Sequence, residues 1–70
     1  MTRHFQTRDG RLTARVILLA HRFGCAYTDL TVTSEREIFS VAISLTGPEF
    51  ALRRLDAQIG KLLEYEKETV

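Results

Sequence analysis

The chain is poor in cysteine, in net charge and in long apolar runs, and each shortage excludes a class of protein. Its single cysteine, Cys25, excludes an internal disulfide and any CxxC redox or metal motif, which is typical of a reducing compartment. Ten Lys and Arg residues against nine Asp and Glu residues give a formal charge of +1. A charge this small does not hold a polyanion, so no nucleic-acid partner is expected.

The shortage of apolar runs excludes a second group of proteins. The longest nearly unbroken apolar run, Val16–Ala20, is far shorter than the roughly 20 residues that a membrane-spanning helix needs. The N-terminal residues MTRHFQTRDGR are polar and lack the apolar segment of a secretory signal. We therefore expect a cytoplasmic protein with no membrane association.

What remains is the composition of one small globular domain, residues 1–70. The chain is 44% hydrophobic and 27% charged, a mixture that argues against disorder. A chain of this size buries only about 60% of the surface that it exposes when unfolded, so a partner subunit is a reasonable expectation. Arginines gather in the first third of the chain and glutamates at its end: Arg3, Arg8, Arg11, Arg15 and Arg22 against Glu64, Glu66 and Glu68.

The first third of the chain predicts a strand followed by a helix. Thr2–Thr7 has Phe5 as its main apolar residue and predicts a short strand. Apolar residues then recur at i, i+4, i+7 and i+11, which predicts an amphipathic helix over Leu12–Phe23. Gly24 is a natural residue for the position just beyond the end of this helix.

The middle of the chain predicts a β-hairpin. Cys25–Thr33 alternates, and the polar turn Ser34–Arg36 leads to a cleaner alternation over Phe39–Leu45. In the first strand one face carries Ala26, Thr28, Leu30 and Val32, and the other carries Tyr27, Asp29, Thr31 and Thr33. In the second strand one face carries Phe39, Val41, Ile43 and Leu45, and the other carries Ser40, Ala42 and Ser44. Since each strand has one apolar face, the sheet is expected to be covered on one side.

The last third predicts a second helix and a final strand. In TGPE, Thr46 can cap a helix, Pro48 suits its first turn and Glu49 stands at the capping-box position. The helix is expected to end near Leu63, and Glu64–Val70 predicts a charged edge strand. The order βαββαβ is that of the ferredoxin-like fold, an α+β architecture with a four-stranded antiparallel sheet and two helices on one face.

No set of residues has the pattern of a catalytic or metal site. Cys25 is expected to be a small buried apolar residue. His4 and His21 lack a spacing that favours metal ligation. The RNA-recognition module shares the βαββαβ order, but its base-stacking aromatics are missing from the predicted open face. We therefore expect neither an enzyme nor a cofactor bound by this chain.

The loop between the first strand and the first helix is the remaining candidate site. Backbone N–H groups at a helix N-terminus are unpaired and carry positive dipole character, so they can receive a carboxylate. Asp9 can equally cap the helix and occupy those donors itself, and the residue types favour this second interpretation.

The stretch ARVILLAHRFGCAYTDLTVT, Ala14–Thr33, resembles the ACT domain of the acetolactate synthase (acetohydroxyacid synthase) small regulatory subunit. That family shows a helix with Arg-Val, an Arg-rich last turn, a Gly and a strand that ends in a Leu-Thr-Val-like sequence. The matching residues, in order and spacing, are Arg15-Val16, His21-Arg22, Gly24 and Leu30-Thr31-Val32. Gln58–Val70 is similar to the family's second helix and final strand, through Lys61-Leu62-Leu63.

The resemblance implies a regulatory domain rather than an enzyme. ACT domains pair edge to edge, which implies a homodimer or a higher even oligomer. They bind an amino acid at the first strand–helix loop, in this family a branched-chain product such as valine. The implied partner is the large, thiamine-diphosphate-dependent catalytic subunit of acetolactate synthase, whose activity the small subunit raises. By position the effector loop falls on Arg8, Asp9, Gly10, Arg11 and Leu12.

This loop departs from the family pattern, which usually reads Asn-x-Pro-Gly-x-Leu. Gly10 and Leu12 keep the Gly-x-Leu, but the Asn and the Pro are missing. Arg15 also lies one residue further from Gly10 than it does in the family spacing. The resemblance therefore implies a degenerate or altered valine-type loop. Two alternatives stay open: a stand-alone amino-acid-binding ACT module that regulates another enzyme, and a single-stranded nucleic-acid binder.

Overall fold

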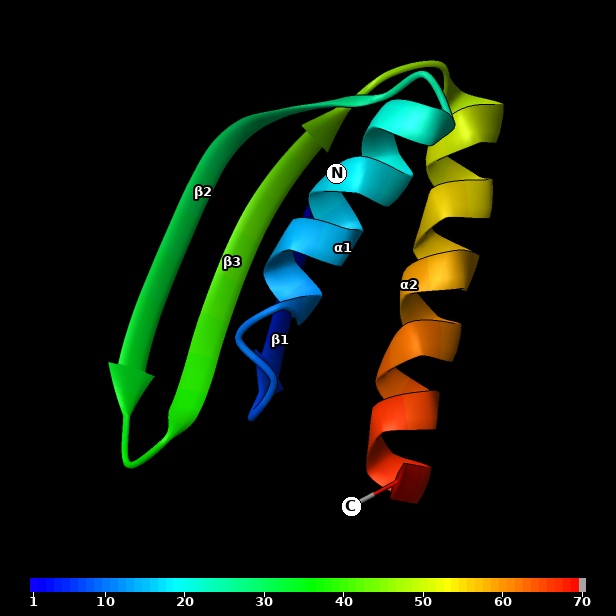
Figure 1. Ribbon diagram of the computed structural model, residues 1–70. Coiled ribbons are helices and arrows are strands. Elements are labelled where there is room, and N and C mark those ends of the chain that lie inside the picture. The colour runs from blue at the N-terminus through cyan, green and yellow to red at the C-terminus, as the bar shows by residue number, and fades with distance from the viewer. Residues whose placement is uncertain (70) are drawn as a thin grey trace.

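A three-stranded sheet with two helices packed against it forms the computed structural model of this chain (Figure 1). The structure describes the backbone of residues 1–69 and the side chains of residues 1–64. In chain order the elements are β1 (Thr2–Thr7), α1 (Leu12–Arg22), β2 (Ala26–Glu35), β3 (Ile38–Thr46) and α2 (Glu49–Thr69). The α+β class is confirmed, as are the first strand, the first helix and the hairpin.

β3 is the central strand of the sheet. The strand order is β1-β3-β2, and β3 runs antiparallel to both neighbours. Both helices lie on the same face of the sheet, so the opposite face is open, as predicted (Figure 1). β1 and β2 therefore form the two edges of the sheet among the described residues. This arrangement is compatible with a ferredoxin-like fold, of which three strands are present.

The final strand predicted over Glu64–Val70 is wrong for the described residues, because α2 continues through Thr69. Val70 lies outside the described residues. The predicted helix end near Leu63 is wrong for the same reason. Residues 64–69 are rich in Glu and Lys, which favour helix, and no Gly or Pro interrupts them. A strand here would depend on pairing with β1, whereas the helix needs only its own backbone. β1 is consequently an edge strand and not a central one.

α1 forms where it was predicted because one of its faces is apolar and its end is well defined. Leu12, Val16 and Ala20 are buried under it. At its C-terminus Cys25 N–H donates to the Ala20 carbonyl at 2.9 Å, and Gly24 N–H donates to the His21 carbonyl at 3.0 Å. These two bonds form a Schellman motif, which needs a left-handed residue just after the helix. Gly24 supplies it, with φ of 76°.

The hairpin turn lies later than predicted. Ser34 and Glu35 are still paired, with Phe39 and Ile38. The connection consists of Arg36 and Glu37, whose φ values of 52° and 67° are both positive. Two positive φ angles are the mark of a type I′ turn, whose twist matches that of the flanking strands. Because neither residue is Gly or Asn, the sequence carries no simple signal for this turn.

A bulge in β2 changes which face its first residues occupy. Tyr27 pairs with Leu45 and Asp29 pairs with Ser44, so Thr28 is the extra residue. The prediction that Tyr27 shares a face with Asp29 is therefore wrong, since Tyr27 lies at the register of the covered face. Beyond the bulge Leu30 opposes Ile43 on the covered face and Thr31 opposes Ala42 on the open face, as predicted.

The core fills the space between the sheet and the two helices. Its most deeply buried side chains are Ile43, Leu55 and Ile59, each 0% exposed, and Val16, 1% exposed. Cys25 is also buried, as predicted. At the margin of the core Arg3 of β1 donates to Asp56 Oδ1 of α2 at 2.6 Å. This ion pair holds α2 over the strand at the edge of the sheet.

Candidate functional site

The predicted effector loop joins β1 to α1 and is closed by its own hydrogen bonds. The hydroxyl of Thr7, a buried residue at the end of β1, accepts the N–H of Asp9 at 2.9 Å. The same hydroxyl donates to the Asp9 carbonyl oxygen at 3.3 Å, and Leu12 N–H donates to that oxygen at 3.0 Å. The loop is thus a compact turn built around Asp9, and Thr7 is a member that the sequence pattern did not indicate.

The carboxylate of Asp9 is occupied by Arg11. Its Oδ1 accepts the backbone N–H of Arg11 at 2.9 Å and the Nε–H of the same residue at 3.4 Å. The backbone hydrogen bond from Arg11 is the main cause that lowers the pKa of Asp9, and the positive charges of Arg11 and Arg15 add to it.

The prediction that Asp9 caps α1 is wrong in its position. The residue at the N-cap is Arg11, and it makes no side-chain cap hydrogen bond. The Asp9 carboxylate accepts the N–H of Arg11, two positions further on, which is an Asx-type hydrogen bond. It therefore does not accept the N–H groups of the first helical turn, which an N-cap side chain would accept. Among the described residues the N–H groups of Thr13 and Ala14 form no hydrogen bond with the loop.

The other predicted loop residues are divided between the core and the surface. Leu12 is 3% exposed and belongs to the core, so it is not available to a ligand at the surface. Gly10 has no positive φ, and a Cβ added there would lie in ordinary contact with the ring of Phe39. Arg8 and Arg11 are exposed. The structure therefore brings Asp9 and Arg11 together, and a ligand carboxylate at this helix N-terminus would meet the negative charge of Asp9.

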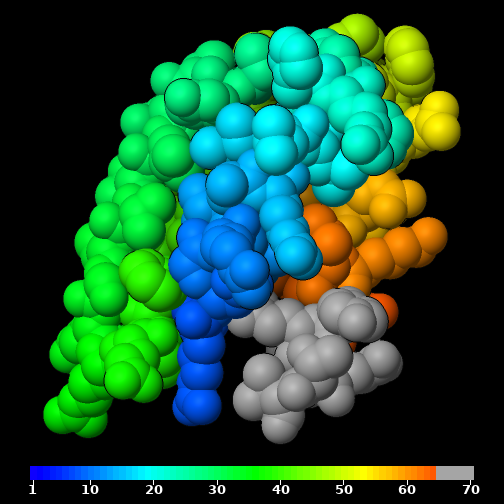
Figure 2. Space-filling model, viewed as in Figure 1, coloured from blue at the N-terminus to red at the C-terminus, as the bar shows by residue number. Residues whose placement is uncertain are grey.

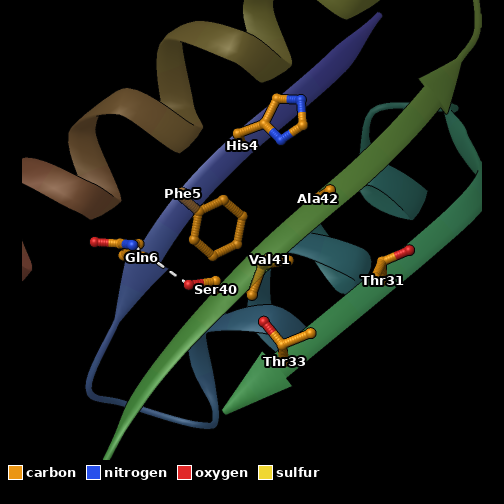
Figure 3. A pocket seen from close by; sticks show the side chains of 8 residues that line it. All are labelled: His4, Phe5, Gln6, Thr31, Thr33, Ser40, Val41 and Ala42. Atoms are coloured by element: carbon orange, nitrogen blue, oxygen red, sulfur yellow. Dashed lines mark hydrogen bonds between the residues drawn. The ribbon is translucent and has the colours of Figure 1, made fainter. Parts of the chain in front are cut away.

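The open face of the sheet carries a second candidate site, a shallow trough of about 420 Å³ (Figure 3). Its polar lining comes from all three strands: His4 and Gln6 of β1, Ser40 of β3, and Thr31 and Thr33 of β2. Gln6 Nε2 donates to Ser40 Oγ at 3.3 Å across the first pair of strands (Figure 3). The trough exists because β3 places the small side chains of Ser40 and Ala42 along the middle of the face.

The trough can form hydrogen bonds through the hydroxyl, amide and imidazole groups of its lining. Among the described residues that line it, His4 is the only titratable side chain, and none carries a carboxylate or a thiol. The sequence pattern placed Thr31, Thr33, Ser40 and Ala42 on this face and missed His4 and Gln6. The alternation of Thr2–Thr7 around Phe5 carries that signal, since residues on either side of a buried strand residue point to the other face.

The remaining candidates for chemistry lie apart from one another. Cys25 is buried, His4 is on the open sheet face and His21 is exposed in the last turn of α1. Within the part of the chain that the structure describes, no three His, Cys, Asp or Glu side chains gather closely enough to hold a metal ion. Neither of the described helices is both long and apolar enough to cross a bilayer.

No protein-family model, curated protein or solved structure matches this chain. Its function therefore has to be inferred from the residue pattern and from the geometry described above.

Proposed function

We propose that this chain is a cytoplasmic, non-catalytic regulatory subunit of acetolactate synthase, an enzyme of branched-chain amino acid biosynthesis. It would bind the thiamine-diphosphate-dependent catalytic subunit and raise its activity. One observation carries the proposal: Ala14–Thr33, the stretch that resembles an ACT domain, spans most of α1, the left-handed Gly24 and most of β2. This stretch supports the proposal through the order helix, glycine turn and strand, whereas Gln58–Thr69, expected to hold the end of a helix and a final strand, is helical throughout.

The open edges of the sheet support the dimer that this function implies. Within the described part of the chain, β1 and β2 each pair on one side only, with β3. β2 is 10 residues long and exposed along nearly all of its length. Unpaired backbone groups at such edges can form ladders with another chain. In a regulatory dimer two copies would join edge to edge, and a further strand beside β1 would complete the four-stranded ACT sheet. Slower amide hydrogen exchange in β1 and β2 on assembly would reveal this pairing.

An altered effector loop is part of the proposal. Asp9 already occupies the amide of Arg11, and Leu12 is buried in the core, so the loop is stable without a ligand. Activation of the catalytic subunit is accordingly expected to be insensitive to valine.

Reconstitution tests the proposal directly. The purified chain is mixed with the acetolactate synthase catalytic subunit of the same organism, and complex formation is followed by size-exclusion chromatography with light scattering. Acetolactate formation is measured with and without the chain. We expect a complex at micromolar concentrations and a rise in activity. Absence of any complex at these concentrations would contradict the proposal.

A thermal-shift screen of the amino acids distinguishes the proposed subunit from the alternative, a stand-alone amino-acid-binding ACT module. A ligand at 100 times its dissociation constant stabilises the fold that it binds by about 2.7 kcal/mol, which is readily seen in a melting curve. Stabilisation by one amino acid, in a chain that forms no complex with the catalytic subunit, would favour an amino-acid-sensing module that acts on another enzyme.

A further inference from the structure

The surface of α1 that faces away from the sheet is basic, with an apolar residue among the charges. Arg11 at the N-cap and Arg15, Leu18 and Arg22 within the helix recur at i, i+4, i+7 and i+11, the spacing of one helix face. We call these four residues the basic ridge. All four are exposed, and Leu18 keeps 69% of its surface accessible.

Among the side chains that the structure describes, few negative charges lie against the basic ridge. α1 contains no acidic residue, and His21 adds a further basic side chain to its last turn. Arg15 and Arg22 form no salt bridge with any residue that the structure describes. Arg11 has a single long contact, 3.4 Å from its Nε to Asp9 Oδ1. The ridge therefore presents positive charge outward, even though the whole chain carries only +1.

Leu18 contributes little to the core of this fold. The side of α1 that faces the core is supplied by Leu12, Val16 and Ala20. A second exposed apolar residue, Phe50, 70% exposed, lies in the first turn of α2. That turn is close to the end of α1, since Arg54 lies over the ring of Phe23 at 5.7 Å. Figure 2 shows α1 in blue to cyan on the near face, with the yellow first turns of α2 beside its C-terminal end.

We infer that the basic ridge is the surface through which this chain docks on the catalytic subunit of the proposed function. It fits an acidic surface with an apolar depression that receives Leu18. An apolar centre with a polar rim is the usual anatomy of protein interfaces, and Arg is enriched among the residues that dominate binding. Arg15 and Arg22 are two helical turns apart, so the carboxylates that they meet should lie about 10 Å apart. Nucleic acid fits less well, because the ridge carries no aromatic side chain on which a base could stack.

Three exposed-site variants of the full chain test this inference against the same catalytic subunit. Arg15→Glu reverses a charge of the ridge, and Leu18→Ala removes its apolar side chain without disturbing the helix. Arg36→Glu is the matched control, since it makes the same change in net charge at the exposed hairpin turn, away from α1 (Figure 1). Melting curves establish that each variant is folded, and titration calorimetry gives the dissociation constant at low and high salt.

We expect Arg15→Glu to weaken the complex about ten-fold or more and Leu18→Ala about five-fold, while Arg36→Glu changes it less than about two-fold. The affinity of the unaltered chain should fall as salt is raised. If the unaltered chain forms the complex and neither ridge variant weakens it, the ridge inference fails and the proposed function stands. If the unaltered chain forms no complex, both fail. Retention of the unaltered chain on single-stranded RNA, lost in Arg15→Glu, would assign the ridge to nucleic acid and overturn the inference.

Discussion

The two outer surfaces of this protein, the helix layer and the open sheet face, differ in how far their polar groups are already satisfied. On the open face Thr2 Oγ1 lies 3.2 Å from Ser44 Oγ, and Gln6 donates to Ser40 at 3.3 Å, so short polar side chains pair with one another across strands. On the basic ridge Arg15 and Arg22 have no acidic partner among the described residues. The polar side chains of the open face thus pair with one another, whereas Arg15 and Arg22 remain available to an acidic partner from outside the chain.

The largest expected difference in stability lies between two neighbouring residues of β3, one on the covered face of the sheet and one on the open face. Ile43 is 0% exposed beneath the helices, whereas Ser44 points to the open face. Ile43→Ala should lower the free energy of unfolding by about 2–5 kcal/mol, because it removes buried methyl groups and leaves a cavity. Ser44→Ala should change it by less than about 0.5 kcal/mol. Urea denaturation followed by circular dichroism measures both, and similar losses would contradict a core on one side of the sheet.

Breaking the ion pair between β1 and α2, at the margin of the helix layer, should lower the free energy of unfolding by a smaller amount. Arg3 and Asp56 are 2.6 Å apart, and their side chains are 30% and 43% exposed. Arg3→Met keeps much of the packing and should cost about 1 kcal/mol, less than for a fully buried charged pair because water screens this one. A double-mutant cycle with Asp56→Asn isolates the interaction, which should weaken in high salt. A coupling energy of zero would show that α2 is held over β1 by apolar contacts alone.

Asp9 should give a pH-dependent effect at the loop that borders the basic ridge. Because hydrogen bonding to Arg11 lowers the pKa of Asp9 in the folded state, its ionised form stabilises the fold. This contribution is fully present above the unfolded pKa of about 3.9 and is lost as the pH falls through the lower folded value. Asp9→Asn should therefore be less stable than the unaltered chain at pH 6, and the gap should close in acid. A gap that is constant with pH would contradict this cause.

Leu18→Ala should have the smallest effect on stability, although it removes a large side chain. Leu18 is 69% exposed, and Ala is the stronger helix former, so the free energy of unfolding should change by less than about 0.5 kcal/mol. Thermal and urea denaturation measure it. A loss comparable with that of Ile43→Ala would mean that Leu18 serves the core, and the contrast between ridge and core would disappear.

Local signals in the sequence predicted the elements whose boundaries depend on their own residues. The apolar stripe of α1 and Gly24 predicted both the helix and its end, which the structure confirms with a Schellman motif. The bulge at Thr28 and the turn at Arg36 and Glu37 were missed, because both depend on how β2 aligns with β3. For the candidate loop, the sequence predicted that Asp9 caps α1, whereas in the structure the Asp9 carboxylate accepts the backbone N–H of Arg11. That partner depends on where β1 ends, since Thr7 orients the turn.

Periodicity by itself determined that this protein has a sheet with one apolar face and amphipathic helices to cover it, because burial of apolar side chains imposes those spacings. Only the tertiary structure decided the strand order β1-β3-β2, which leaves β1 and β2 at the edges of the sheet among the described residues. It also decided which charges find partners: Arg3 meets Asp56 across the fold, while Arg15 and Arg22 point away from it. These outcomes depend on contacts between residues far apart in the chain, which no local pattern encodes.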